Sequence, residues 1–125
     1  MINGIKPVVG NTTKTEKTTT KNGLSFDEAM DSLLLNIQVA YDNWNDNGKT
    51  LDLSLKPGRK FIKVVEGTRV WGFIAKVDGV HKGLPMLKGD ILKAATWRAP
   101  AKHSRGSIFD SEMHKSFSWT GPNYL

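Results

Sequence analysis

The feature that most constrains the fold is a change in hydrophobic period within the first half of the chain. Upstream of the change, apolar side chains recur every three or four residues, the spacing of one face of an α-helix. They are Phe26, Met30, Leu33, Leu34, Ile37, Ala40, Tyr41 and Trp44. Ser25 and Glu28 have the spacing of a capping box, and Asn47-Gly48 offers a left-handed stop. The pattern predicts one long amphipathic helix within residues 24–48.

Downstream of this helix, apolar and polar residues alternate, which is the period of β-strands. The expected strands are residues 51–55, 59–66, 68–76 and 90–94. Pro57-Gly58 and Gly67 supply the turns between the first three. Residues 97–125 contain apolar anchors but no sustained period, so we expect an irregular basic C-terminal segment. The fold class is therefore α+β: the helix packs on a small antiparallel sheet of three or four strands.

The first 23 residues are predicted to form a flexible N-terminal tail. Residues 12–21 contain only Thr, Lys and one Glu, so burial of this segment would not offset the entropy lost on ordering it. A few apolar residues near the start leave a second reading, in which the tail docks as an arm on a neighbour or on the sheet edge. Residues 24–125 then form a single domain, with the helix in 24–48 and the sheet and C-terminal extension in 51–125.

Charge is unevenly distributed along the 125 residues, whose net charge is +6. Residues 1–25 carry +3, residues 26–47 carry −5 and residues 48–125 carry +8. An acidic helix beside a basic body indicates a polyanionic partner, although lysines also keep small β-rich domains soluble. No apolar run approaches the length of a membrane span, and no apolar leader opens the chain, so we expect neither a membrane partner nor secretion. The chain has no cysteine, which excludes disulfides.

Catalytic and cofactor motifs are missing from the sequence. His81, His103 and His114 have no close ligand partner for a metal. No G-x-S-x-G elbow is present, and residues 56–60 (KPGRK) form a basic turn rather than a phosphate-binding G-x-x-x-x-G-K-[ST] loop. We therefore expect no metal, no cofactor, no catalytic residue and no enzymatic activity.

Nucleic-acid contact is the chemistry that the basic body favours. Affinity for a phosphate backbone needs several cations on one surface, and aromatic rings can stack on unpaired bases. The candidate residues are Arg59, Lys60, Lys63, Arg69, Trp97, Arg98, Lys102, His103 and Arg105. The last five lie in a predicted loop over residues 97–105. By strand alternation Trp71 and Phe73 fall on one face, where we expect them to belong to the core rather than to the binding surface.

A resemblance to a known group of proteins rests on the C-terminal half. Residues 89–102 (GDILKAATWRAPAK) and 105–110 (RGSIFD) resemble small proteins of unknown function encoded by tailed bacteriophages. Residues 56–64 (KPGRKFIKV) and 121–125 (GPNYL) are similar to them as well. The likeness covers roughly residues 55–125, which places the tail and the acidic helix outside it as an addition specific to this chain.

The resemblance implies origin rather than activity. The leading hypothesis is a phage-encoded, non-enzymatic accessory protein that contacts nucleic acid in the host cytoplasm. The alternative is a protein-interaction role, as a minor virion component or a modulator of a host protein. The partner would then bind the acidic helix, whose apolar side is widened by Leu35 and Val39, or the N-terminal tail.

Overall fold

The computed structural model describes residues 21–124 and contains one α-helix there, α1 (Phe26–Trp44). The predicted capping box is confirmed: Ser25 Oγ accepts a hydrogen bond from the Glu28 amide (3.2 Å), and Glu28 Oε1 accepts one from the Ser25 amide (2.9 Å). The predicted stop at Asn47-Gly48 is wrong, because the backbone is already extended at Asn45. Asn and Asp dominate the sequence that follows Tyr41, and these residues favour turns over helix interiors.

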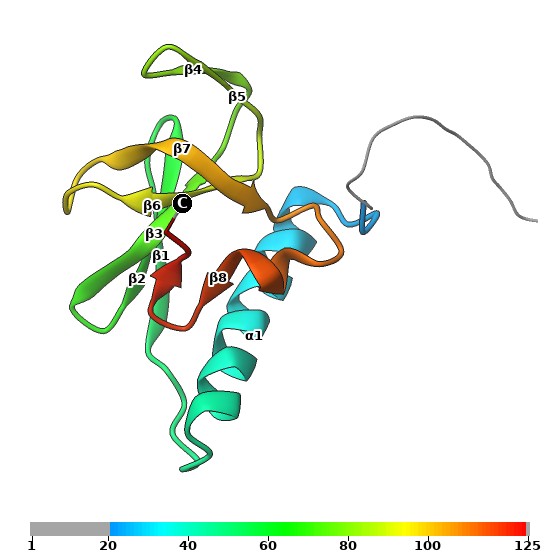
Figure 1. Ribbon diagram of the computed structural model, residues 1–125, viewed down its shortest axis with the longest axis vertical. Coiled ribbons are helices and arrows are strands. Elements are labelled where there is room, and N and C mark those ends of the chain that lie inside the picture. The colour runs from blue at the N-terminus through cyan, green and yellow to red at the C-terminus, as the bar shows by residue number, and fades with distance from the viewer. Residues whose placement is uncertain (1–20, 125) are drawn as a thin grey trace, which may run out of the picture.

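A five-stranded antiparallel sheet, in the order β1-β2-β3-β6-β7, forms the body of the molecule (Figure 1). Its strands are β1 (Leu53–Pro57), β2 (Phe61–Glu66), β3 (Arg69–Ala75), β6 (Asp90–Ala94) and β7 (Pro100–Ser107). The α+β class is thus confirmed, with one strand more than expected. A short hairpin, β4 (Gly79–His81) and β5 (Leu84–Met86), is inserted between β3 and β6.

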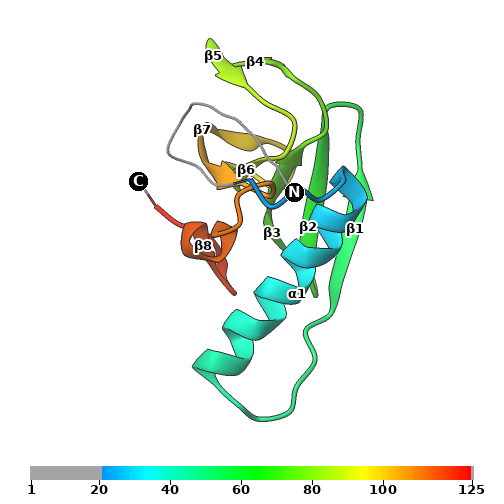
Figure 2. The same ribbon diagram turned by 90° about the vertical axis from the view of Figure 1, so that its right-hand side faces the viewer.

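The prediction of an irregular segment over residues 97–125 is wrong in its first part, because β7 occupies residues 100–107. This strand lies at the sheet edge, where most of its polar side chains remain in solvent, so it carries no apolar alternation to read. A 3-10 turn, η1 (Met113–Ser116), and the two-residue strands β8 (Phe117–Ser118) and β9 (Gly121–Pro122) follow. Figure 2 shows this C-terminal segment beside α1.

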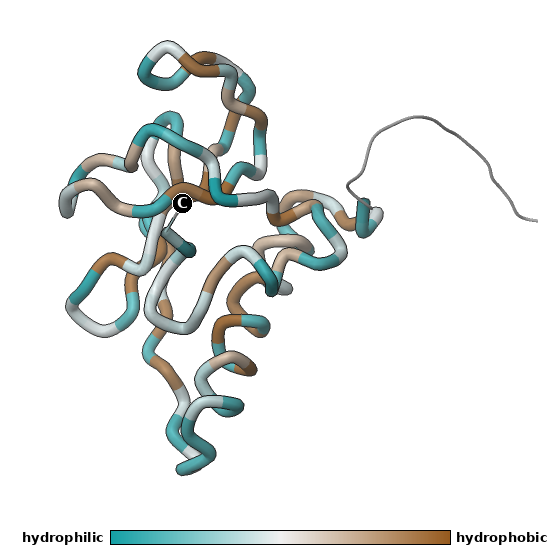
Figure 3. Tube along the Cα trace, in the orientation of Figure 1, coloured by the Kyte–Doolittle hydropathy of each residue, from teal (hydrophilic) through white to brown (hydrophobic). Residues whose placement is uncertain are grey.

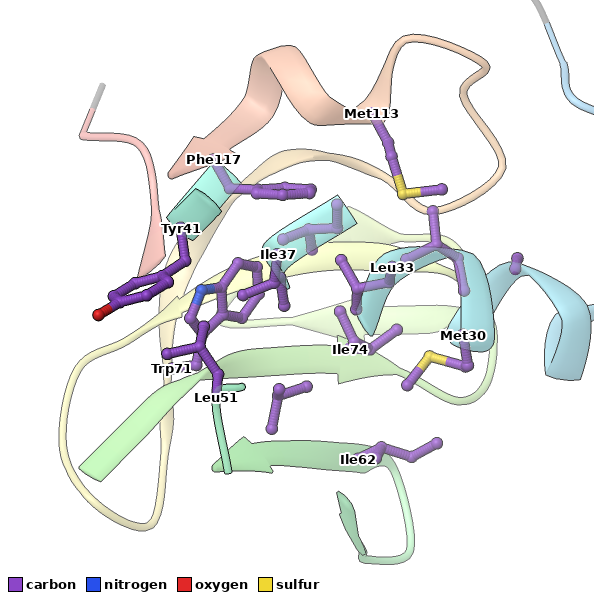
Figure 4. Packing of buried hydrophobic residues seen from close by; sticks show 14 residues of the cluster. Met30, Leu33, Ile37, Tyr41, Leu51, Ile62, Trp71, Ile74, Met113 and Phe117 are labelled. Atoms are coloured by element: carbon purple, nitrogen blue, oxygen red, sulfur yellow. The ribbon is translucent and has the colours of Figure 1, made fainter. Parts of the chain in front are cut away.

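The main hydrophobic core lies between α1 and one face of the sheet. Figure 4 shows side chains from α1 directed toward the sheet, with side chains of the C-terminal segment closing the core from a third direction. The buried residues are Ala29, Met30, Leu33, Ile37, Tyr41, Leu51, Ile62, Val64, Trp71, Ile74, Ile91, Ile108, Met113 and Phe117. The predicted helical stripe therefore packs on the sheet, except at its end, where Trp44 has an exposed fraction of 63%. In Figure 3 the chain at the end of α1 and just after it is hydrophilic, and residues 42–50 are exposed there.

A β-bulge in β3 overturns the expectation that Trp71 and Phe73 share one face. Val64 of β2 pairs with Gly72 and Val65 pairs with Val70, which leaves Trp71 as the extra residue. Trp71 consequently joins the core under α1, where its Nε1 donates a hydrogen bond to the Ser118 carbonyl (3.1 Å). Phe73 points to the opposite face.

That opposite face of the sheet, here called the outer face, has a smaller hydrophobic cluster of its own. Its buried residues are Phe73, Ala75, Met86 and Leu92, with Phe61, Val70 and Ala94 packed around them. Because Met86 belongs to β5, the β4-β5 hairpin covers part of this face. The sheet is therefore apolar on both sides, and its outer face remains available for a surface site beside the cluster.

At the N-terminal end of the described residues, Lys21 forms an isolated antiparallel bridge with Asp110. The Asn22 amide donates a hydrogen bond to the Phe109 carbonyl (2.9 Å), and its side chain donates one to the Ile108 carbonyl (2.9 Å). Residues 1–20, which make up most of the predicted tail, lie outside the described residues. Within residues 21–124, no helix is long and apolar enough to cross a membrane.

Candidate functional site

A basic groove lies on the outer face, between the β1-β2 turn and the loop that joins β6 to β7. It is a shallow cavity of about 390 Å³. Its lining residues are Lys56, Pro57, Gly58, Arg59, Lys60, Phe61, Lys63, Phe73 and Arg98. Five of these nine residues are cationic and none is acidic. Of the predicted candidates, the fold brings Arg59, Lys60, Lys63 and Arg98 together here.

Strand register explains why the cations converge. Lys56 of β1 is directly opposite Lys63 of β2, and Lys63 is directly opposite Phe73 of β3. Directly paired residues project from the same face of a sheet, so both lysines lie on the outer face. Like charges placed opposite each other destabilise a strand pair. Among residues 21–124 the ion pairs are Arg69 with Glu66 and Lys115 with Glu112, so no carboxylate there neutralises the groove.

The β1-β2 turn that carries Arg59 and Lys60 is held in place by hydrogen bonds. The Gly58 amide donates to the Phe61 carbonyl (2.8 Å), and Lys76 Nζ donates to the Gly58 carbonyl (2.9 Å). The Lys76 amide also donates to the Lys60 carbonyl (2.8 Å). The ammonium of Lys76, the residue that follows β3, thus supports the turn, while the side chains of Arg59 and Lys60 remain exposed.

The loop between β6 and β7 places Arg98 in the groove and Trp97 beside it. Lys63 Nζ lies 4.3 Å from the centroid of the Trp97 ring, the geometry of a cation–π contact. Trp97 retains an exposed fraction of 49%. A large aromatic ring therefore stands at the rim of a cationic depression, in contact with one of its cations.

The remaining predicted site residues lie elsewhere. Arg69 is paired with Glu66 through Nε (3.3 Å) and donates from Nη1 to the Thr120 carbonyl (2.9 Å). Lys102, His103 and Arg105 are on strand β7 rather than in the predicted loop. Arg105 donates from Nη1 to the Asn123 carbonyl (2.7 Å), which attaches the C-terminal segment to the sheet edge, and from Nε to the His103 carbonyl of its own strand (3.0 Å).

Lys56 is the groove cation that the sequence analysis missed. It belongs to the basic run of residues 56–60, from which the sequence predicts only Arg59 and Lys60 as site residues. A signal was present: antiparallel strands joined through Pro57-Gly58 place Lys56 opposite a residue in the middle of the next strand. Pro57 pairs with Ile62, so the preceding residue, Lys56, pairs with Lys63, and the two lysines lie on the same face of the sheet.

A second cavity, of about 820 Å³, is lined by residues that flank the β4-β5 hairpin and by residues 104–110, with three aspartates and two lysines in its lining. Each carboxylate accepts a backbone hydrogen bond: Asp78 from the Lys88 amide (2.7 Å), Asp90 from the Leu87 amide (3.0 Å) and Asp110 from the Glu112 amide (2.9 Å). Burial raises the pKa of Asp90; the Leu87 hydrogen bond opposes this shift and the charge of Asp78 adds to it. No group of three metal-ligating side chains occurs in the described part of the chain. The three aspartates therefore stabilise the backbone of the neighbouring loops by accepting hydrogen bonds from amide groups.

The fold and the groove define a small α+β protein with a cationic, aromatic-rimmed surface. The chain belongs to a family of unknown function (DUF7717), whose model matches residues 9–125. This match includes α1, so the helix is not an addition specific to this chain, as the shorter resemblance had implied. Searches of curated proteins and of solved structures found no match.

Proposed function

We propose that this is a phage-encoded, non-enzymatic accessory protein that contacts nucleic acid through the basic groove. The observation that carries the proposal is the convergence of five cations on one depression without a carboxylate in its lining. The two directly opposed lysines, Lys56 and Lys63, repel each other until an anion lies between them. Several phosphates of one backbone are the anions that suit a surface with five cations. The phage origin rests on the C-terminal motif alone.

The salt dependence of binding follows from the number of groove cations. Each phosphate neutralised contributes a slope of about −0.7 for single strands, or −0.9 for duplex DNA, in log K against log salt. If all five cations contact phosphates, the slope approaches roughly −3.5 for a single strand. Anisotropy titrations of a labelled oligonucleotide from about 50 to 200 mM salt measure this slope directly.

Matched double variants localise the contact. In Lys56→Gln/Lys60→Gln, two groove cations are removed, so we expect the slope to become less steep by about 1.4. In Lys49→Gln/Lys115→Gln, the same net charge is removed from exposed lysines outside the groove, and the slope should remain that of the wild type. Equal changes in slope for both variants would refute the proposal that nucleic acid binds at the groove. Absence of binding at low salt would refute the function.

The proposed setting is the host cytoplasm during infection, with the virion as the alternative. Quantitative mass spectrometry of purified particles and of infected-cell lysate separates the two, because a packaged protein keeps a fixed ratio to capsid protein through purification. Loss of the chain from the particles with continued recovery from lysate supports the cytoplasmic setting. A constant ratio to capsid protein supports the virion.

A second candidate function, protein interaction, is favoured by the solvent side of α1. Leu35 and Val39 have exposed fractions of 64% and 44%. Asp27, Asp31, Leu35 and Val39 follow one another at four-residue intervals and so lie on one helical face. An exposed apolar pair beside acidic groups complements a basic amphipathic segment of a partner protein.

A synthetic amphipathic peptide with a Leu stripe bordered by Lys tests this surface. We expect it to bind the wild type, and we expect Leu35→Ser/Val39→Ser to abolish binding because both apolar contacts are lost. A peptide with Glu in place of Lys is the control for charge. Unchanged binding by the double variant contradicts the proposal. If sedimentation shows that the wild type self-associates through this face, the surface binds a second copy of this chain instead of a partner protein.

A further inference from the structure

Trp97 has no packing role that explains its position. It lies in the β6-β7 loop, about half of its surface is exposed, and it belongs to neither hydrophobic cluster. The residue that it contacts through its ring, Lys63, is itself a lining residue of the groove, and the next residue in the chain, Arg98, is another. The indole is therefore placed at the groove rather than in the core.

The loop that carries Trp97 is held by hydrogen bonds among its own residues. Thr96 Oγ1 accepts hydrogen bonds from the Arg98 amide (3.2 Å) and the Ala99 amide (3.1 Å). The Ala95 and Thr96 amides both donate to the Ala99 carbonyl (2.9 and 3.1 Å). A ligand that uses Trp97 consequently loses little affinity to ordering of this loop.

The Lys63 ammonium occupies one side of the indole. At 4.3 Å from the ring centroid, it lies over a ring face rather than beside the edge. Because Lys63 occupies one ring face and the side chain keeps an exposed fraction of 49%, the opposite face is the one left for a ligand. A planar group can stack on that face while its substituents reach the cations below.

The other aromatic residues of the groove are already engaged. Phe61 packs edge-on against Phe73 (centroids 6.2 Å apart) and against His81 (5.3 Å). Phe73 is buried in the outer-face cluster. Within residues 21–124, Trp97 is thus the exposed aromatic side chain at this groove, whereas Phe61 and Phe73 are partly or fully buried.

We propose that the groove takes single-stranded nucleic acid, with one unpaired base stacked on Trp97 and the adjoining phosphates on the groove cations. This inference rests on the proposed nucleic-acid function and adds the class of substrate. In a duplex, both faces of each base are covered by neighbouring base pairs, so an exposed indole gains nothing from it. An unpaired base has a free face for stacking, which is a sequence-tolerant source of affinity.

Three ligands separate stacking from phosphate contact, of which the two single strands are matched in charge and the duplex carries twice as many phosphates. They are oligothymidylate of about 12 nucleotides, within the typical 4–16 nucleotide range of single-strand sites, an abasic oligomer of equal length, and a duplex of equal length. We expect the wild type to bind oligothymidylate more tightly than either of the others. In Trp97→Ala, its affinity for oligothymidylate should fall roughly 5- to 140-fold. Affinity for the abasic oligomer and for the duplex should change little.

Two further variants control for folding and for generic loss of an aromatic ring. Trp97→Phe keeps a stacking face and should retain part of the affinity for oligothymidylate. Trp44→Ala removes an exposed tryptophan at the far end of α1, outside the groove, and should leave all three affinities unchanged. Thermal melts of each variant confirm that the comparison is between folded proteins.

The outcomes distinguish this inference from the function on which it rests. If Trp97→Ala binds every ligand like the wild type while Lys56→Gln/Lys60→Gln binds weakly, the stacking inference is overturned and the nucleic-acid function stands. A wild type that prefers the duplex, or an equal loss for oligothymidylate and the abasic oligomer, also overturns it. If no ligand binds at low salt, both fall together.

Discussion

Two leucines on α1, one buried and one exposed, provide a direct test of how the helix packs. Leu33 has an exposed fraction of 0% and is directed toward the sheet (Figure 4), whereas Leu35 has an exposed fraction of 64%. The substitutions Leu33→Ala and Leu35→Ala make the same chemical change in the same helix. Any difference in their effect therefore measures burial, because helix propensity changes equally in both.

The magnitude for Leu33→Ala follows from the buried carbon that is lost. Removing three carbons at about 0.8 kcal/mol each gives roughly 2.4 kcal/mol of transfer free energy. The cavity that remains raises the cost to about 3–5 kcal/mol, in the range of other buried Leu→Ala changes. For Leu35→Ala we expect a change in the free energy of unfolding within about 0.5 kcal/mol.

Urea denaturation followed by circular dichroism measures both variants. We expect Leu33→Ala to lower the midpoint with an unchanged m-value, and we expect Leu35→Ala to overlay the wild type. At roughly 4 °C per kcal/mol for a domain of this size, Leu33→Ala should also melt about 12–20 °C lower. An equal loss of stability in both variants would refute the packing described here, because it would mean that Leu35 is also buried in the molecule in solution.

Three further predictions concern a cap, a close approach and a carboxyl group. Ser25→Ala removes the capping acceptor and should cost about 1 kcal/mol in the free energy of unfolding, whereas Ser25→Gly should cost only a few tenths. Gly106→Ala should cost about 1–3 kcal/mol, because the new Cβ would lie 2.8 Å from Ser116 Cβ and closer still to its Oγ; the added change Ser116→Gly should recover part of the loss in the same denaturation assay. Asp90 has a raised pKa, so the folded state holds this proton more tightly and wild-type stability falls as pH rises through the window between the unfolded and folded pKa values. Asp90→Asn should therefore gain stability relative to the wild type toward neutral pH and lose that gain in acid, and the opposite trend in pH-dependent melts would contradict the assignment.

Local signals explain what could be predicted of the fold. The start of α1 was predictable because Ser25 and Glu28 satisfy each other within one turn, without help from the rest of the chain. Strand β7 was not, because an edge strand that exposes polar side chains has no hydrophobic period. The bulge at Trp71 was also invisible, because one extra residue in β3 is defined only by its pairing with β2.

Part of the groove could also be predicted from local sequence. Arg59 and Lys60 lie in one turn, and Lys63 lies in β2, the strand that follows the turn. Their closeness in sequence therefore predicts that they are close in space. Arg98 reaches them only because the β6-β7 loop lies over the outer face. Arg69 has an equally basic sequence context, but it starts β3 beside Glu66, and the two pair across the turn. Counting cations along the chain cannot separate these cases, whereas strand register can.

The opposed lysines of β1 and β2 have a consequence for the isolated protein. Repulsion between Lys56 and Lys63 destabilises the folded chain most when few counterions are present, since the screening length is about 30 Å at 0.01 M salt and about 3 Å at 1 M. Added salt therefore screens the repulsion between Lys56 and Lys63, and it also weakens the attraction of the groove to phosphates. Thermal stability without ligand and affinity for nucleic acid should respond to ionic strength in opposite directions, and Lys56 and Lys63 contribute to both responses.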